Sequence, residues 1–287
     1  MTGGTCMVSV GRHRLAARVL GTGTPAVVIE PSFGGCAADW VVLARVLAAD
    51  TTVVCYDRAP YGASSPARDD RTPGEIAADL DRLLAGLQVT GPLVLVGHSA
   101  GGLYVRAYAA EHLNRVAGMV LVESSHEGQG RVVDPLRSRR VRLNMALNVP
   151  LTFCRMGASG PRGDRRSVIR EWQSFRRATA GQPPLPPGGL GGRPLIVLTC
   201  APPDAVAPPP IWLAWHGLHR ELAGLSANSM HLVSVSPDHH LNRCDPDLVT
   251  AAVREVVRCA RSGAPLGELL GMPPGPARPD APGSEAD

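Results

Sequence analysis

The sequence predicts an α/β fold built on a mostly parallel sheet. Short apolar runs rich in valine, isoleucine and leucine recur along the chain, and they lack the polar alternation of a half-exposed strand, which is typical of strands covered on both faces. Segments with helical spacing separate these runs, and an alternation of strand and helix favours parallel strands joined by right-handed crossovers. The predicted strands lie at residues 26–30, 52–57, 93–97, 118–123, 195–200 and 230–235.

Local signals place the ends of two helices and one hairpin. Residues 72–75 read Thr-Pro-Gly-Glu, which supplies an N-cap, a proline in the first helical position and a capping-box glutamate. Asp245 and Pro246 open a second helical segment, and Gly263 is its predicted stop. Residues 6–10 and 15–20 flank a short polar turn, so they predict an antiparallel hairpin ahead of the parallel strands.

The chain length allows one large core with one insertion. The 287 residues are 44% hydrophobic and only 19% charged, which excludes disordered and coiled-coil classes. The alternation breaks after residue 123 for about 70 residues, which is too long for a loop in a compact sheet. We therefore expect one large core and a helical lid, followed by a disordered tail without periodicity. The predicted boundaries are 1–123 and 194–263 for the core, 124–193 for the lid with its Gly/Pro-rich return, and 264–287 for the tail.

Composition excludes several classes of function. A net charge of +4 and 4% aromatic residues predict no nucleic-acid partner. The seven cysteines are scattered and never spaced C-x-x-C, which indicates neither a disulfide framework nor a zinc site. No apolar stretch is long enough for a signal peptide core or a membrane span, so we expect a cytoplasmic protein without an integral membrane segment. The sequence specifies no oligomeric state.

A nucleophile motif follows one of the predicted strands. Residues 97–101 read Gly-His-Ser-Ala-Gly, with an apolar strand before them and a helical run after them, which is the required context of G-x-S-x-G. Gly97 and Gly101 let strand and helix approach closely around a strained turn. Ser99 is therefore the candidate nucleophile, and the amide of Ala100 at the helix N-terminus is a candidate oxyanion donor.

With these motifs the chain resembles the α/β-hydrolase fold superfamily, and within it a bacterial group of serine esterase-like hydrolases. The resemblance runs from about Val8 to Arg261, apart from the predicted lid. It implies an eight-stranded, mostly parallel sheet with helices on both faces, a lid inserted after the sixth strand, and a catalytic triad. The segments that carry it are 33–35, 39–40, 56–62, 97–101, 120–126, 236–241 and 245–246.

The resemblance also assigns roles to individual residues. The second oxyanion donor is the amide of Phe33, in the loop after a strand. The general base is His239, because its spacing before the closing helix fits the family better than that of His240. Two carboxylates are candidates for the orienting acid, Glu123 at the end of the sixth strand and Asp204 after the seventh. The similarity of residues 120–129 to the group favours Glu123, and Asp204 remains the alternative.

These assignments predict a serine hydrolase that cleaves an ester or a related acyl bond of a small molecule through an acyl-enzyme. The chemistry calls for no metal and no organic cofactor. A serine nucleophile argues against dehalogenase and epoxide hydrolase activity, which in this fold generally use an aspartate. An aminopeptidase, a thioesterase or a carbon–carbon bond hydrolase with the same triad remains an alternative, as does a non-catalytic ligand-binding or signalling protein.

Overall fold

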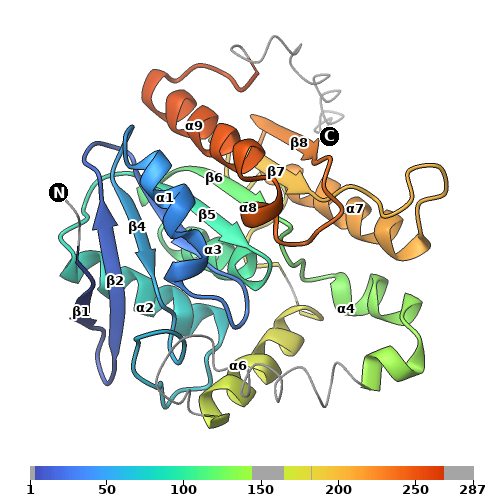
Figure 1. Ribbon diagram of the computed structural model, residues 1–287, viewed down its shortest axis with the longest axis horizontal. Helices are drawn as coiled ribbons and strands as arrows, with labels where there is room; N and C mark the ends of the chain where they lie inside the picture. The colour runs from blue at the N-terminus through green and yellow to red at the C-terminus, as the bar shows by residue number, and fades with distance from the viewer. Residues whose placement is uncertain (1–3, 144–164, 182, 268–287) are drawn as a thin grey trace, which may run out of the picture.

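One sheet of eight strands organises the computed structural model, which describes residues 4–143, 165–181 and 183–267 (Figure 1). The strands lie side by side in the order β1-β2-β4-β3-β5-β6-β7-β8. β2 is antiparallel to both of its neighbours, and the strands from β4 to β8 are parallel, so the predicted fold class is confirmed. The bounds are β1 Cys6–Ser9, β2 Arg14–Leu20, β3 Ala26–Glu30, β4 Val53–Tyr56, β5 Leu93–His98, β6 Val116–Val122, β7 Leu195–Thr199 and β8 Ser229–Val233.

Helices cover both faces of this sheet. α1 and α9 pack on one face, while α2, α3 and α7 pack on the other (Figure 1). The longer helices are α1 Val41–Leu47, α2 Pro73–Gly86, α3 Ala100–Glu111, α6 Arg165–Ala178, α7 Pro210–Ala223 and α9 Pro246–Ser262. The short ones are η1 Ala37–Trp40, η2 Leu113–Arg115, α4 Gln129–Val132, η3 Asp134–Leu136 and α8 Leu241–Cys244.

Two apolar layers explain the unbroken hydrophobic runs in the strands. Successive side chains of a strand point to opposite faces. In β3, Val27 therefore joins the layer beneath α1 and α9, and Val28 joins the layer beneath α2 and α3. Both residues are completely buried, so neither face of the strand tolerates a polar residue.

The local signals read from the sequence are borne out at the helix ends. The hydroxyl of Thr72 accepts from the amide of Glu75, and the Glu75 carboxylate accepts from the amide of Thr72, which completes the capping box of α2. Gly263 ends α9 with φ 72°, a left-handed conformation that favours glycine.

The chain between β6 and β7 carries α4, η3 and α6, in the interval expected for a lid. α6 places Val168, Trp172 and Phe175 in a third apolar cluster that includes Phe33 and Leu103 of the core. The predicted lid is described over 124–143, 165–181 and 183–193, and its remaining residues lie outside the described part of the chain. The predicted disordered tail lies outside it from residue 268 onward.

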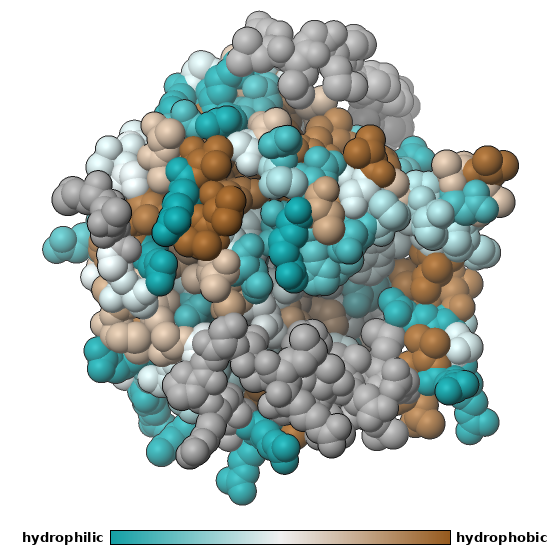
Figure 2. Space-filling model, viewed as in Figure 1, coloured by the Kyte–Doolittle hydropathy of each residue, from teal (hydrophilic) through white to brown (hydrophobic). Residues whose placement is uncertain are grey.

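The surface exposes apolar side chains over α1 and over the α4 region of the insertion, where brown atoms gather in Figure 2. In these segments the large exposed apolar residues include Val42, Val46, Val132 and Leu136. None of the described helices combines the length and the apolar character that a bilayer span requires.

Candidate active site

Ser99 occupies a strained turn between β5 and α3. Its backbone has φ 53° and ψ −120°, a conformation that costs a non-glycine residue roughly 1–3 kcal/mol. The flanking glycines are required by close packing. A Cβ on Gly97 would lie 2.7 Å from the Cα of Gly102, and a Cβ on Gly101 would lie 2.2 Å from the carbonyl oxygen of Glu30. The two positions thus exclude any larger residue, which allows the turn that presents Ser99.

Glu123 begins a second strained turn at the end of the neighbouring strand. The apolar pattern predicts Glu123 as the last residue of the strand, but β6 ends at Val122, and Glu123 has φ 47°. β5 and β6 are paired in parallel, with His98 opposite Val122, and the amide of Ser99 donates to the Val122 carbonyl at 3.0 Å. Ser99 and Glu123 therefore leave the sheet at the same level. Strain of this kind is concentrated at functional sites in proteins.

The carboxylate of Glu123 accepts three hydrogen bonds and is only 2% exposed. Nδ1 of His239 lies 3.0 Å from Oε2, and the indole Nε1 of Trp215 donates to the same oxygen at 3.2 Å. The amide of Cys200 donates to Oε1 at 2.7 Å. Burial by itself would raise the pKa of Glu123, but the bonds from His239 and Cys200 and the nearby imidazole of His219 outweigh it and lower the pKa to about 2.

His239 lies in the loop after β8, and a buried histidine holds its backbone. Because a carbonyl can only accept, Nε2 of His98 is the donor in the 3.0 Å bond to the carbonyl oxygen of His239. Burial and the neighbouring His239 ring lower the pKa of His98 to about 3, so this imidazole stays neutral. His240, the neighbour that the sequence analysis set aside, is exposed and bonds through its amide and Nδ1 to Asp238.

Asp204, the alternative acid, is engaged elsewhere. It is exposed, and its Oδ1 accepts from the amides of Val206 and Ala207 at 2.9 and 3.1 Å. These bonds form a turn of the kind that aspartate favours in loops. Within the described chain no hydrogen bond or ion pair joins Asp204 to His239. The structure therefore brings Glu123, and not Asp204, together with the candidate base.

A cavity of about 520 Å³ joins the candidate nucleophile and base. Ser99 and His239 both line it, and most of the remaining wall is apolar. The aromatic part of the wall consists of Phe33, Trp172, Phe175, Trp212 and Trp215. The insertion supplies Ser125, Gln129, Val133, Arg137, Trp172 and Phe175.

The two candidate oxyanion donors come from different elements. Ala100 is the first residue of α3, where backbone amides have no acceptor within the helix. Phe33 lies in the loop between β3 and η1, and its ring is 7% exposed. The ring packs 5.3 Å from the ring of Trp172 and 6.0 Å from that of Tyr61, measured between centroids. Phe33 thus contributes both to the cavity wall and to the apolar cluster that supports it.

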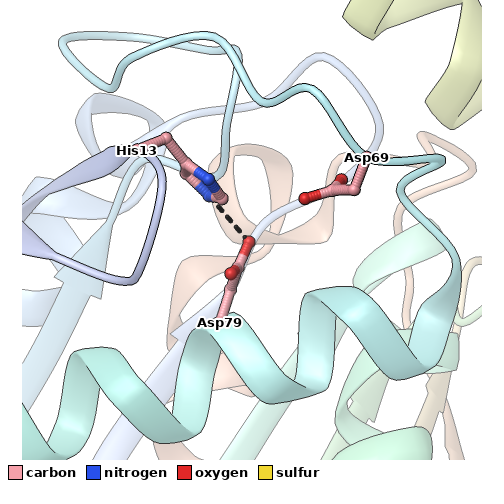
Figure 3. A group of neighbouring side chains, drawn as sticks. All are labelled: His13, Asp69 and Asp79. Carbon is pink, nitrogen blue, oxygen red and sulfur yellow. Dashed lines mark hydrogen bonds and ion pairs between the residues drawn. The ribbon is translucent and has the colours of Figure 1, made fainter.

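A second group of ionisable side chains lines no part of this cavity. His13, Asp69 and Asp79 lie close enough together to resemble a cation site (Figure 3). Nε2 of His13 lies 2.9 Å from Asp79, and Nη1 of the buried Arg71 donates to Asp79 at 2.6 Å and lies 3.4 Å from Asp69. Because Arg71 pairs with both carboxylates and Arg82 also lies 3.4 Å from Asp79, we assign the group a structural role between α2 and the turn after β1.

Sequence reasoning missed three residues of the site. His98 sits inside the nucleophile motif as its variable residue, and Trp215 lies in a segment for which the sequence predicts no role. Arg58 lies in the motif at 56–62 but received no role. An arginine directly after a predicted buried strand is the signal that could have drawn attention to it, because arginine is rarely buried without partners.

Comparisons with known proteins agree with this architecture. A family model described as the alpha/beta hydrolase fold matches residues 25–155. A probable transporter of Hormonema carpetanum is 32% identical over 129 residues, 42% of this chain, but the chain spans only 18% of its length. An AB hydrolase superfamily protein of Gibberella zeae is 25% identical over 281 residues, 83% of this chain and 87% of that protein.

Solved structures show the same fold. A thermophilic esterase of Thermogutta terrifontis superposes with a TM-score of 0.63 at 22% identity, over 90% of this chain and 100% of that one. An enol-lactonase of Burkholderia xenovorans gives 0.64 at 18% identity, over 88% and 100%. The chain therefore has the α/β-hydrolase fold.

Proposed function

We propose that the protein is a serine hydrolase that cleaves an ester or a related acyl bond of a small molecule. One observation carries the proposal: the 3.0 Å bond between Nδ1 of His239 and the buried carboxylate of Glu123, at the edge of a cavity that Ser99 also lines. A serine, an imidazole and an orienting carboxylate in this relation are the parts of an activated nucleophile.

The reaction follows from the donor pattern. Because Nδ1 of His239 donates to Glu123, Nε2 carries the lone pair and accepts the hydroxyl proton of Ser99. The Oγ atom attacks the acyl carbon, and the amides of Phe33 and Ala100 stabilise the negative charge that develops on the carbonyl oxygen. The imidazolium then protonates the leaving alkoxide, and an acyl-enzyme results. Water, deprotonated by the same imidazole, releases the acid.

The environment of Glu123 suits the role of orienting acid. Its lowered pKa, about 2, keeps the carboxylate charged at neutral pH, where it stabilises the imidazolium formed during proton transfer. Its remaining bonds, to the indole of Trp215 and the amide of Cys200, hold it in one orientation. A fixed carboxylate fixes the ring of His239 and selects the tautomer that can act as base.

The cavity favours an apolar substrate with a flat group. The chain has three phenylalanines, four tryptophans and four tyrosines, and five of these eleven rings line the wall. Aromatic walls of this kind bind rings through offset or edge-to-face contacts. Since α6 and α4 border the cavity, we propose that the described parts of segment 124–193 act as its lid and set the acyl or alcohol group that fits.

A serine-directed probe tests the proposal with a matched control. Ser125 also lines the cavity and is 2% exposed, so S125A removes a second cavity hydroxyl without touching the proposed nucleophile. We expect the wild type and S125A to hydrolyse p-nitrophenyl phenylacetate and to be labelled by a fluorophosphonate, and S99A to do neither. Labelling that persists in S99A refutes the assignment. A wild type that binds the ester but neither cleaves it nor reacts with the probe is a binding protein instead.

A further inference from the structure

Arg58 is buried beneath the loop that carries one proposed oxyanion donor. Its side chain is 1% exposed, and all five of its N–H groups have an acceptor. Nη1 donates to Oε1 of Glu30 at 2.6 Å and to the carbonyl oxygen of Pro31 at 3.0 Å. Nη2 donates to the carbonyl oxygen of Ser32 at 3.0 Å and to Oε1 of Glu171 at 2.7 Å, and Nε donates to the same Glu171 oxygen at 3.0 Å.

The bond to Ser32 acts on the peptide unit that supplies the oxyanion donor. The carbonyl of Ser32 and the amide of Phe33 belong to one planar group, and in a trans peptide the C=O and the N–H point in opposite directions. A guanidinium that holds the carbonyl from the protein interior therefore aims the amide away from itself. The positive charge also draws electron density toward the carbonyl oxygen, which makes the amide proton a stronger donor.

We propose that Arg58 is a positioning residue of the oxyanion hole: it orients and polarises the Ser32–Phe33 peptide so that the Phe33 amide faces the reacting carbonyl. The inference rests on the proposed function, because it presupposes that this amide receives an oxyanion. Arg58 itself touches neither the substrate nor the reacting atoms.

An arginine suits this place better than any other residue. The guanidinium presents its donors in a fixed planar fork, so bonds to the carbonyls of Pro31 and Ser32 set the loop in one geometry. Burial would lower the pKa of Arg58, but Glu171 and Glu30 outweigh it and raise that pKa, which keeps the group charged. A lysine would offer three donors from a single point and could not hold both carbonyls and both carboxylates at once.

The same guanidinium connects the oxyanion loop with the insertion. Glu171 lies on α6, is completely buried, and also accepts from the hydroxyl of Tyr104 at 3.2 Å. The next residue, Trp172, lines the cavity and packs on the ring of Phe33. The ion pair between Glu171 and Arg58 therefore links α6 to the peptide that carries the Phe33 amide.

The first test is R58K, with R71K as its control. Both arginines are buried and paired with carboxylates, but Arg71 bonds to Asp79 and Asp69 and makes no bond to the Pro31–Phe33 loop. Loss of a complete oxyanion donor lowers kcat about 100- to 1,000-fold, so a misdirected donor should lower it roughly 10- to 100-fold. We expect this fall in R58K with KM changed less than about threefold, and kcat of R71K within about twofold of the wild type. Equal kcat values for the two variants, or a loss confined to KM, would overturn the proposal.

A direct readout of the peptide separates this inference from the proposed function. The chain has only three phenylalanines, so labelling with 15N-phenylalanine gives three backbone amide signals, and F33L identifies the one from Phe33. In the ligand-free protein we expect R58K to move the Phe33 signal and R71K to leave it in place. An unmoved signal in R58K refutes the orienting role of Arg58, whatever the protein catalyses.

The same labelled proteins report on the oxyanion. The Ser99 hydroxyl adds to the carbonyl carbon of a trifluoromethyl ketone. An O–C bond forms, the carbonyl oxygen becomes an oxyanion, and the hydroxyl proton of Ser99 passes to His239. We expect the Phe33 amide proton to move downfield in the wild type and in R71K, and to move by less than half as much in R58K. If no adduct forms even in the wild type, the proposed function fails, while the ligand-free comparison still decides the role of Arg58.

A second variant keeps the proposal testable if R58K does not fold. E171Q keeps an oxygen that can accept from Arg58 but removes the negative charge of residue 171. The guanidinium of Arg58 is then held less firmly, while the side chain at position 171 keeps its size. We expect a smaller fall in kcat, about threefold to tenfold, with the Phe33 signal displaced in the same direction as in R58K. An E171Q protein with wild-type kcat and an undisplaced Phe33 signal contradicts the proposed link.

Discussion

Replacing Glu123 with glutamine should nearly abolish turnover, because every partner of this side chain is a donor. The amide of Cys200 faces Oε1, while Nδ1 of His239 and the indole of Trp215 face Oε2. Glutamine can present its oxygen to only one side. If its NH2 faces His239, Nδ1 must become the acceptor, the proton moves to Nε2, and the ring can no longer accept the proton of Ser99.

The size of the effect follows from the loss of the correct tautomer and of the fixed charge. A triad acid replaced by its amide lowers kcat by about 10,000-fold. The fall in the pKa of Glu123 from 4.5 to about 2 corresponds to about 3 kcal/mol of stability. Because this pKa is lowered, the contribution is present above pH 4.5 and is lost as the pH falls toward 2. E123Q should therefore also be less stable at pH 7, and its stability should vary less with pH in this window.

The assay compares E123Q with D204N, the same change at the alternative acid. We expect D204N to keep wild-type kcat and KM for p-nitrophenyl phenylacetate, because Asp204 only caps a turn. Burst and steady-state rates at pH 8 measure kcat, and urea unfolding at pH 7, 4 and 3 measures stability. A large fall in kcat for D204N, or E123Q with activity within tenfold of the wild type, would refute the assignment of the acid.

Three further outcomes follow from particular contacts. W215F removes an indole bond to the proposed acid, worth about 1 kcal/mol, and should lower kcat about fivefold. W212F, whose indole donates to a backbone carbonyl in the same cavity, should leave kcat within about twofold of the wild type. D79N removes the carboxylate of Asp79, which is shown in Figure 3. Burial would raise the pKa of Asp79, but His13 and Arg71 lower it, so the charged carboxylate stabilises the fold and this contribution is lost as the pH falls below 3.8. Acid unfolding followed by circular dichroism should therefore depend less steeply on pH in D79N than in the wild type. G101A should lower the free energy of unfolding by about 3 kcal/mol, because the new Cβ meets the last carbonyl of β3, whereas G217A on the open side of α7 should not destabilise the protein in a thermal melt.

The fold was accessible from the sequence because its signals are local. An apolar run such as residues 26–30 reports that both faces of a strand are buried, and the capping residues Thr72 and Glu75 lie three positions apart. The nucleophile turn is equally local, since Gly97, Ser99 and Gly101 are read from five consecutive residues. The predicted strand ends differ from the observed ones by at most two residues, and β6 ends before Glu123 because the strained turn there has no sequence signal of its own.

The acid of the site could not be chosen in the same way. Glu123 and Asp204 both follow strands that end at the same edge of the sheet, and strand spacing alone allows either to reach an imidazole. The turn at residues 204–207 directs Asp204 into bonds with its own backbone, while the turn after β6 directs Glu123 toward His239. That choice depends on how two loops fold in space.

The sequence by itself determined the sheet, the helix ends and the position of Ser99, because each depends on neighbours within a few residues. Tertiary structure alone decided which side chains surround that serine. Arg58 meets Glu171 across 113 positions of the chain, and Glu123 meets His239 across 116. Such pairs leave no periodic or local pattern, since the chain between them contributes only the geometry that brings them together. The chemistry of the site therefore became readable only once the folded chain placed these charges side by side.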